Sequence, residues 1–126
     1  DSNNDFAIFR LSDIILMEAE ALNELGDGPG AIELINRVRN RGFASSGADI
    51  EDTGFNQTSL RDQILLERGH ELFWEGFRRQ DLIRHGKFCE ERLYKPVDDD
   101  CEKRKLFPIP QAVIDVNDAI VQNPGY

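Results

Sequence analysis

Two helical patterns open the chain, and only a short glycine-rich turn separates them. The first covers about residues 11–25, with Ser12 or Asp13 as the expected N-cap, and the second covers about residues 29–41. So short a connection makes two helices pack side by side in opposite directions. The spacing of apolar residues predicts one inward face on each helix, formed by Ile14, Ile15, Met17, Ala21, Leu22, Leu25, Ile32, Leu34, Ile35 and Val38.

Small residues within this pair indicate how closely the two helices approach. Ala19 and Ala31 lie at positions where a short side chain lets antiparallel helices come near each other. This is the design of a tetratricopeptide unit, whose repeat is about 34 residues. Two such units are fewer than the three or more that a stacked array needs, so we expect this chain to pack against additional structural elements.

A second pair of helices is predicted after a polar loop at residues 43–58. The third helix covers about residues 60–74, with Thr58 or Ser59 as its expected cap, and buries Leu60, Ile64, Leu65, Leu72 and Phe73. A turn near residues 75–76 leads to a fourth helix over about residues 77–85.

Hairpins over about residues 11–41 and 59–86 are therefore expected, followed by a loop-rich tail over residues 87–126. Glycines 26, 42 and 86 are the expected helix ends. Within the tail, "PQAVIDV" indicates a short helical turn, and no segment has a strand pattern. The sequence predicts an all-α fold of tetratricopeptide-like hairpins, of the alpha-alpha superhelix type, with an irregular C-terminal wrap.

Composition excludes several classes of partner. The net charge is −9, from 24 acidic and 15 basic residues, whereas binding to nucleic-acid phosphates requires a basic face. The same balance opposes adsorption to anionic lipid. No apolar run approaches the roughly 20 residues of a membrane-spanning helix.

The stretch "ERGHELFWEGFRRQDLIRHG", residues 67–86, holds both histidines and most of the candidate chemistry. Three glutamates recur every four residues, so they could line a metal or acid–base site. The alternative is a structural ion-pair network, which we favour because like charges at this spacing repel and require partners. Arginine suits that role through its two-point contact with carboxylates. The network would comprise Glu67, Arg68, Glu71, Glu75, Arg78, Asp81 and Arg84.

Metal motifs in this stretch are incomplete. A zinc-protease helix needs a histidine four residues after His70, but that residue is Trp74. A di-iron site needs a second Glu-x-x-His, and Leu82 stands three residues before His85. We expect no metal, no cofactor and no catalytic residue, and hence not an enzyme.

Two further groups have more than one interpretation. Cys89 and Cys101 flank an acidic loop and either form a disulfide in an oxidising compartment or stay as thiols. Their spacing lacks the close pairing of usual zinc sites. Phe73, Trp74 and Phe77 could stack on a sugar or a base, although the core of the hairpin is the interpretation we favour.

Several blocks together resemble a known family. "LSDIILMEAEALNELG", "AIELINRVRNRGF", "LRDQILLERGHELFWEGFRRQDLIRHGKF" and "LFPIPQAVID…QNPGY" are similar, in this order, to the C-terminal part of the SusD/RagB family. The motif residues carrying the resemblance are those of the network together with Leu72, Gly76, Leu82, Ile83, Pro108, Ile109, Pro110, Gln111, Asn123, Pro124, Gly125 and Tyr126. His70, Gln80 and His85 depart from the usual residue types of that pattern.

This resemblance implies a non-catalytic binding protein. Members are outer-membrane lipoproteins of the Bacteroidetes cell surface that capture glycans or other nutrients. Each pairs with a SusC-like TonB-dependent transporter. The 126 residues would be the C-terminal part of such a protein, mostly scaffold and facing the transporter. The membrane anchor would be a lipid on an N-terminal cysteine upstream of this chain.

In that family most ligand contacts come from irregular regions, many of them expected upstream of this segment. The candidates within this chain are the loop aromatics Phe55 and Tyr94, for an oligosaccharide ligand. The alternative hypothesis is a stand-alone tetratricopeptide-like adaptor that binds a peptide in its groove.

Overall fold

The described part of the computed structural model comprises residues 7–43, 49–90, 96 and 100–126. The chain divides into two compact units, Asp1–Arg78 and Arg79–Tyr126. The regular structure of the described residues is helical and includes no strand, so the predicted all-α class is confirmed. The helices are α1 (Leu11–Glu24), α2 (Gly28–Phe43), α3 (Gln57–Glu71), α4 (Arg78–Arg84), the 3₁₀ helix η2 (Lys103–Lys105) and α5 (Gln111–Ile114).

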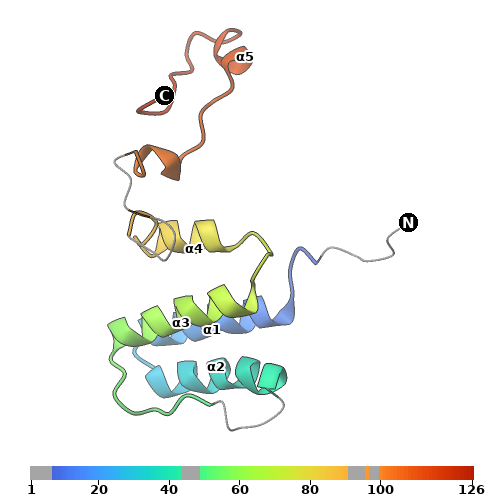
Figure 1. Cartoon of the computed structure of the whole chain (residues 1–126), viewed down its shortest axis with the longest axis vertical. Coiled ribbons are helices and arrows are strands. Elements are labelled where there is room, and N and C mark those ends of the chain that lie inside the picture. The colour runs from blue at the N-terminus through green and yellow to red at the C-terminus, as the bar shows by residue number, and fades with distance from the viewer. Residues whose placement is uncertain (1–6, 44–48, 91–95, 97–99) are drawn as a thin grey trace, which may run out of the picture. The chain divides into compact units, whose positions relative to one another are not determined.

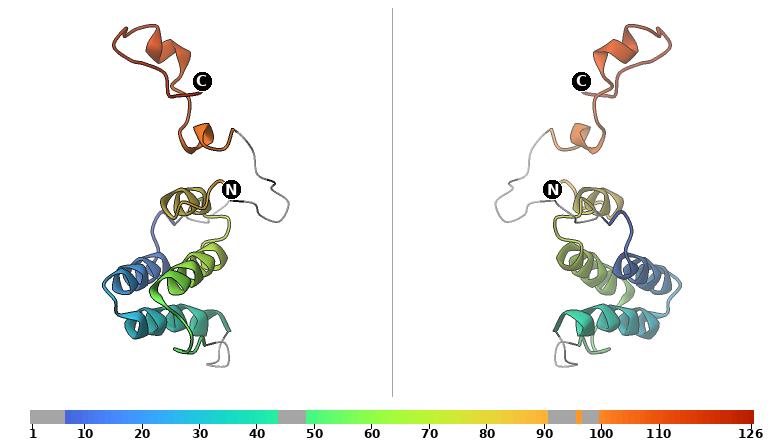
Figure 2. Two further views of the ribbon diagram at one scale, coloured as in Figure 1. Left: turned by 90° about the vertical axis from the view of Figure 1, so that its left-hand side faces the viewer. Right: turned by 90° about the vertical axis from the view of Figure 1, so that its right-hand side faces the viewer.

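The first unit is a packed set of three helices in which α1 contacts both α2 and α3. Figures 1 and 2 show α1 and α3 side by side, with α2 packed across from them. Ala19 and Ala31 are fully buried, as expected where two helices approach closely. A buried aliphatic side chain contributes about 1.5–3 kcal/mol, so the shared core stabilises this unit. Its members are Ile15, Leu16, Ala19, Ala31, Ile32, Ile35, Val38, Leu60 and Ile64.

The predicted inward face of α1 was partly wrong. Ile14, Met17 and Leu25 are exposed. The buried face instead contains Ser12, Asp13, Ile15, Leu16, Ala19 and Asn23. The periodicity predicted one apolar face of α1, but the helix buries an adjacent face. The polar residues Asp13 and Asn23 on that buried face have partners on another helix, Arg68 and Gln57.

Helix starts also differ from the prediction at two places. Arg10, not Ser12 or Asp13, is the N-cap residue of α1. Asn56, not Thr58 or Ser59, caps α3, and its Oδ1 accepts the Ser59 backbone N–H at 2.9 Å. The Ser59 hydroxyl accepts the Asn56 backbone N–H at 2.9 Å in return. This reciprocal capping satisfies two backbone donors at the start of α3.

Helix ends follow the glycines in two of three cases. Gly26 has φ 88° after α1 and Gly86 has φ 71° after α4, the left-handed conformation that glycine adopts at helix ends. Gly42 lies inside α2, which continues to Phe43. Helix α3 ends earlier than predicted, at Glu71, and the turn that follows contains Trp74 at φ 67°.

The second unit is organised around Arg79 and the C-terminal segment. The Arg79 guanidinium lies 4.3 Å from the centroid of the Phe107 ring and 5.5 Å from that of Phe88. It also donates a hydrogen bond to the Arg104 carbonyl at 2.6 Å. Cation–π contacts and a backbone hydrogen bond therefore hold this loop-rich unit together.

Side-chain amides hydrogen-bond to the backbone of the C-terminal segment. Helix α5 lies in this segment, at the predicted helical turn. Gln122 Nε2 donates to the Ile109 carbonyl at 2.9 Å, and its Oε1 accepts the Ile109 N–H at 2.8 Å. Asn123 Nδ2 donates to the Phe107 carbonyl at 2.6 Å. Two amide side chains thus satisfy backbone groups of residues 107 and 109 in this irregular segment.

Candidate functional site

A seam of charged side chains joins the three helices of the first unit. At its centre, Arg68 of α3 donates from Nη1 to Asp13 Oδ1 of α1 at 2.8 Å. Both side chains are almost fully buried. Asp13 Oδ2 is also buried and has no hydrogen-bond partner in this structure. An incompletely satisfied buried carboxylate makes this pair sensitive to any change in its arginine.

A second pair links α3 to α2. Arg39 Nη1 donates to Glu67 Oε2 at 2.8 Å, and the Glu67 side chain is buried. The Arg39 guanidinium also lies 5.5 Å from the centroid of the Phe43 ring. Glu67 and Arg68 are neighbours on α3, so adjacent residues fasten that helix to α2 and to α1 respectively.

Glu71 and Glu75 form the end of the seam with Arg10 and Arg41. Glu71 Oε1 lies 2.5 Å from Nη1 of Arg10 and 2.5 Å from Nη2 of Arg41. Arg10 Nε also donates to Glu75 at 2.8 Å, and Arg10 further contacts the Ser12 hydroxyl and the Glu71 carbonyl. One guanidinium before α1 thereby ties down the end of α3 and the turn after it.

These contacts shift the pKa values of Glu71 and Arg10. Partial burial tends to raise the pKa of Glu71, but hydrogen bonds from Arg10 and Ser12 and the charges of Arg10 and Arg41 outweigh it, so the pKa is lowered. The hydrogen bond to Glu75 raises the pKa of Arg10 despite partial burial. A general acid or base working near neutral pH needs a carboxylate pKa that is raised, so this arrangement favours a structural role for Glu71.

The other predicted members of the network lie at α4. Arg78 Nη1 donates to the Leu65 carbonyl at 2.8 Å. A Cβ atom added at Gly69 would come within 2.8 Å of that nitrogen, so the absence of a side chain there leaves room for the guanidinium. Asp81 is buried, and its Oδ1 lies 3.2 Å from Nη2 of Arg84 one turn later.

The partners of the α3 glutamates were not identified by sequence reasoning. Arg10, Arg39 and Arg41 lie outside residues 67–86, and only tertiary packing brings them to Glu67 and Glu71. A signal for the α1 side of the seam did exist. Asp13 shares the spacing of buried residues 16, 19 and 23, with steps of three, three and four, which is one face of a helix.

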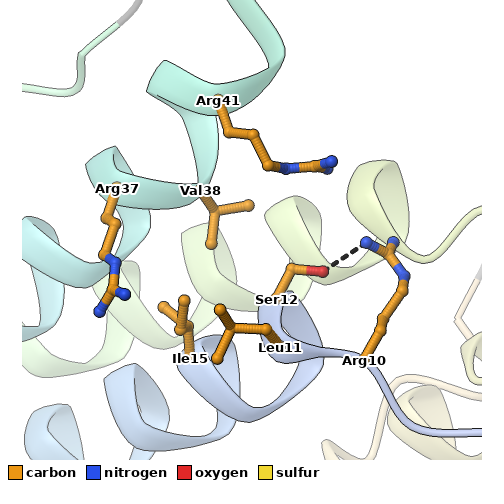
Figure 3. A pocket seen from close by; sticks show the side chains of 7 residues that line it. All are labelled: Arg10, Leu11, Ser12, Ile15, Arg37, Val38 and Arg41. Carbon is orange, nitrogen blue, oxygen red and sulfur yellow. Dashed lines mark hydrogen bonds between the residues drawn. The ribbon is translucent and has the colours of Figure 1, made fainter.

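A pocket of about 360 Å³ lies beside this seam, between α1 and the second half of α2. Figure 3 shows the aliphatic side chains of its floor and arginines around its edge. Its lining consists of Arg10, Leu11, Ser12, Ile15, Arg37, Val38 and Arg41.

Of the two aromatics predicted to contact a ligand, Phe55 and Tyr94, the structure describes only Phe55. Phe55 is partly buried against the core of the first unit and lines a second cavity of about 230 Å³ beside Asn23 and Gln57. There the Asn23 amide donates to the Gln57 carbonyl at 2.9 Å, and Gln57 Nε2 donates to the Asn23 carbonyl at 2.9 Å. Tyr94 lies outside the described residues.

The expected burial of two aromatics in a hairpin core was wrong. Phe73 and Trp74 are 71% and 88% exposed, and their rings meet edge to face with centroids 6.0 Å apart. The early end of α3 at Glu71 explains this, because residues 73 and 74 leave the helix before they can face its core. Trp74 also has positive φ, an uncommon conformation for a residue other than glycine.

The cysteines form a disulfide between Cys89 and Cys101, with Cα atoms 5.6 Å apart. Glu102 places its carboxylate near the two sulfur atoms, and together these three residues form a group with metal-ligand spacing. Sulfurs bonded to each other cannot act as thiolate ligands, so in this state the cluster does not suit zinc.

Among the described residues, no helix is both long enough and apolar enough to cross a membrane. Taken together, the features of the chain define a class: an all-α protein of tetratricopeptide-like helical hairpins, with a charged seam between helices and an irregular C-terminal segment. Comparison with known proteins agrees. The model of the SusD family matches residues 1–126, and the chain belongs to this family.

Individual relatives support the assignment. SusD-like protein P25 of Formosa agariphila is 36% identical, covering 94% of this chain and 24% of that protein. The starch-binding protein SusD of Bacteroides thetaiotaomicron is 28% identical, covering 98% of this chain and 22% of that protein. The crystal structure of a SusD homolog from Bacteroides thetaiotaomicron has a TM-score of 0.71 and 35% identity, covering 91% of this chain and 26% of that one. The chain spans about a quarter of the length of these relatives.

Proposed function

We propose that this chain is part of the non-catalytic glycan-binding component of a SusC/SusD-type uptake system. The observation that carries the proposal is membership of the SusD family across residues 1–126, with a starch-binding protein among its relatives. In this proposal the 126 residues are the C-terminal segment of a longer protein on the outer surface of the outer membrane, anchored by a lipid at the start of that protein. A SusC-like TonB-dependent transporter is its partner.

The role proposed for this segment is mainly to support the binding regions and to face the transporter. The charged seam favours this role, because its acids are held by arginines and the pKa of Glu71 is lowered. Bond cleavage is not expected, since a general acid or base near neutral pH needs a raised carboxylate pKa and the pKa of Glu71 is lowered.

The test is to isolate the native protein from the outer membrane of its own cells. We expect a species several times heavier than 14.4 kDa that carries a lipid-modified N-terminal cysteine and co-purifies with a TonB-dependent transporter. The purified protein should retain oligosaccharides without shortening them, as judged by mass spectrometry of the sugar. A lipid-free species of 14.4 kDa, or hydrolysis of the sugar, would contradict the proposal.

A further inference from the structure

The pocket beside the seam has the size of a small-ligand site. Its volume of about 360 Å³ lies within the range of about 300–1,000 Å³ typical of ligand pockets. It lies entirely within the first unit, between the start of α1 and the second half of α2. Such sites combine an apolar lining with a few polar groups that determine which ligand binds.

The floor of the pocket is aliphatic. Ile15 and Val38 are buried beneath it, and Leu11 is largely exposed at its mouth (Figure 3). A surface of this kind suits the C–H face of a sugar ring or another compact ring, and it offers no flat aromatic platform. The floor therefore provides contact area, while selectivity must come from the edge.

The edge of the pocket is cationic. Arg37 and Arg41 stand one helical turn apart on α2, on either side of Val38 (Figure 3). Like charges at this spacing repel each other, so an anion placed between them would relieve that repulsion. Among the described residues, Arg37 has no hydrogen-bond or ion-pair partner, and Arg41 contacts Glu71 through one nitrogen while its side chain stays 65% exposed.

The local charge stands in contrast to that of the whole chain. Three arginines line the pocket, and the acids that engage two of them are Glu71 and Glu75, in a protein whose net charge is −9. Arg10 is occupied by these two glutamates and serves to position Glu71. The donors available to a ligand therefore belong to Arg37 and Arg41.

We propose that this pocket binds an anionic sugar unit, carboxylated or sulfated, with its ring on the aliphatic floor and its charged group at Arg37 and Arg41. Guanidinium groups bind carboxylate and sulfate-like oxyanions through paired hydrogen bonds. The inference rests on the proposed glycan-binding function and narrows its ligand class to acidic sugars at this position.

The experiment is calorimetric titration of the 126-residue chain with three trisaccharides: galacturonate, neutral galactose and sulfated galactose. We expect the neutral sugar to bind at least about tenfold more weakly than the better of the two anionic sugars. Comparing the two anionic sugars identifies which charged group is preferred. Raising the salt from about 50 mM to about 500 mM should weaken anionic binding, because screening lengths shorten over this range.

Variants locate the binding. Arg37→Gln and Arg41→Gln should each weaken anionic binding, and the double variant should abolish it. Arg37 has no described partner, so its variant should keep the circular dichroism spectrum of the parent chain. The matched control is Arg61→Gln, which removes the same charge from an exposed pair with Glu24 on the same three-helix unit and should leave binding unchanged.

Several results would overturn the inference. These are no anionic binding, equal binding of neutral sugar, or equal losses in Arg37→Gln and Arg61→Gln. In the longer native protein, protection of Arg37 and Arg41 from phenylglyoxal without added sugar would show that another part of the polypeptide fills the pocket, which also overturns it. If the longer protein still captures neutral glycans and the Arg37→Gln change has no effect, only this inference fails and the proposed function stands.

Discussion

Replacing Arg68 by methionine should remove a large part of the stability of the first unit. The change keeps an unbranched side chain but deletes the charge that faces Asp13, which is fully buried. Asp13 Oδ1 would lose its 2.8 Å contact with Arg68, and Oδ2 already has no partner. A bare carboxylate would then remain in the core.

The magnitude follows from the geometry. Two unit charges about 4 Å apart attract by about 4 kcal/mol at the effective dielectric constant of about 20 that suits protein sites. Breaking one side of a buried pair costs about 3–5 kcal/mol by measurement in other proteins. Since whole domains are stable by only about 5–15 kcal/mol, we expect Arg68→Met to lower the free energy of unfolding by about 3–5 kcal/mol.

The assay is urea denaturation of the 126-residue chain, followed by far-UV circular dichroism at neutral pH. The Asp13→Leu/Arg68→Met double variant should recover most of the loss, because replacing a whole buried pair by apolar groups is often neutral or stabilising. Arg61→Met, at an exposed pair with Glu24, is the control and should have little effect. A loss below about 1 kcal/mol for Arg68→Met, the range of surface pairs, would refute the reasoning.

Three other perturbations test separate features. The pKa of Glu71 is lowered on folding, so the contribution of this carboxylate to stability is present above its unfolded pKa of about 4.3 and is lost as the pH falls through the folded pKa. Below about pH 4.3, the free energy of unfolding should therefore fall less steeply in Glu71→Gln than in the parent chain. At Trp74, which has positive φ, the glycine variant should be more stable than the alanine variant by about 1 kcal/mol in urea denaturation, and equal stability would contradict a strained backbone. Without reductant, Cys89 and Cys101 should resist alkylation, and labelling of both thiols in the untreated protein would contradict the disulfide. Cys101→Ser should destabilise the second unit by about 3 kcal/mol in thermal denaturation.

Some of the fold could be predicted because its causes are local. Glycines 26 and 86 end helices α1 and α4 through the left-handed backbone that glycine adopts without penalty. The alanines at positions 19 and 31 marked the close approach of α1 and α2, and both are fully buried. Family motifs were recognisable from residue order alone, and the family assignment is confirmed.

Other features could not be predicted, either because neighbouring residues offered equivalent choices or because the partners are distant in sequence. The α3 cap was misplaced by two or three residues, since Asn, Thr and Ser all stood close together and each can cap a helix. Buried Asp13 and Asn23 on α1 were missed because polar residues are expected outside unless their partners are known. Those partners, Arg68 and Gln57, both belong to α3.

The sequence by itself determined that this chain is helical, roughly where its helices lie, and which family it belongs to, because helix formation and motif order depend on neighbouring residues. Only the tertiary structure decided which charges meet. It joined Arg10, Arg39 and Arg41 to the glutamates of α3, left Phe73 and Trp74 in solvent, and placed three arginines around an aliphatic pocket. Periodicity defines the faces of a helix, but the packing of whole helices selects the residues that each face touches.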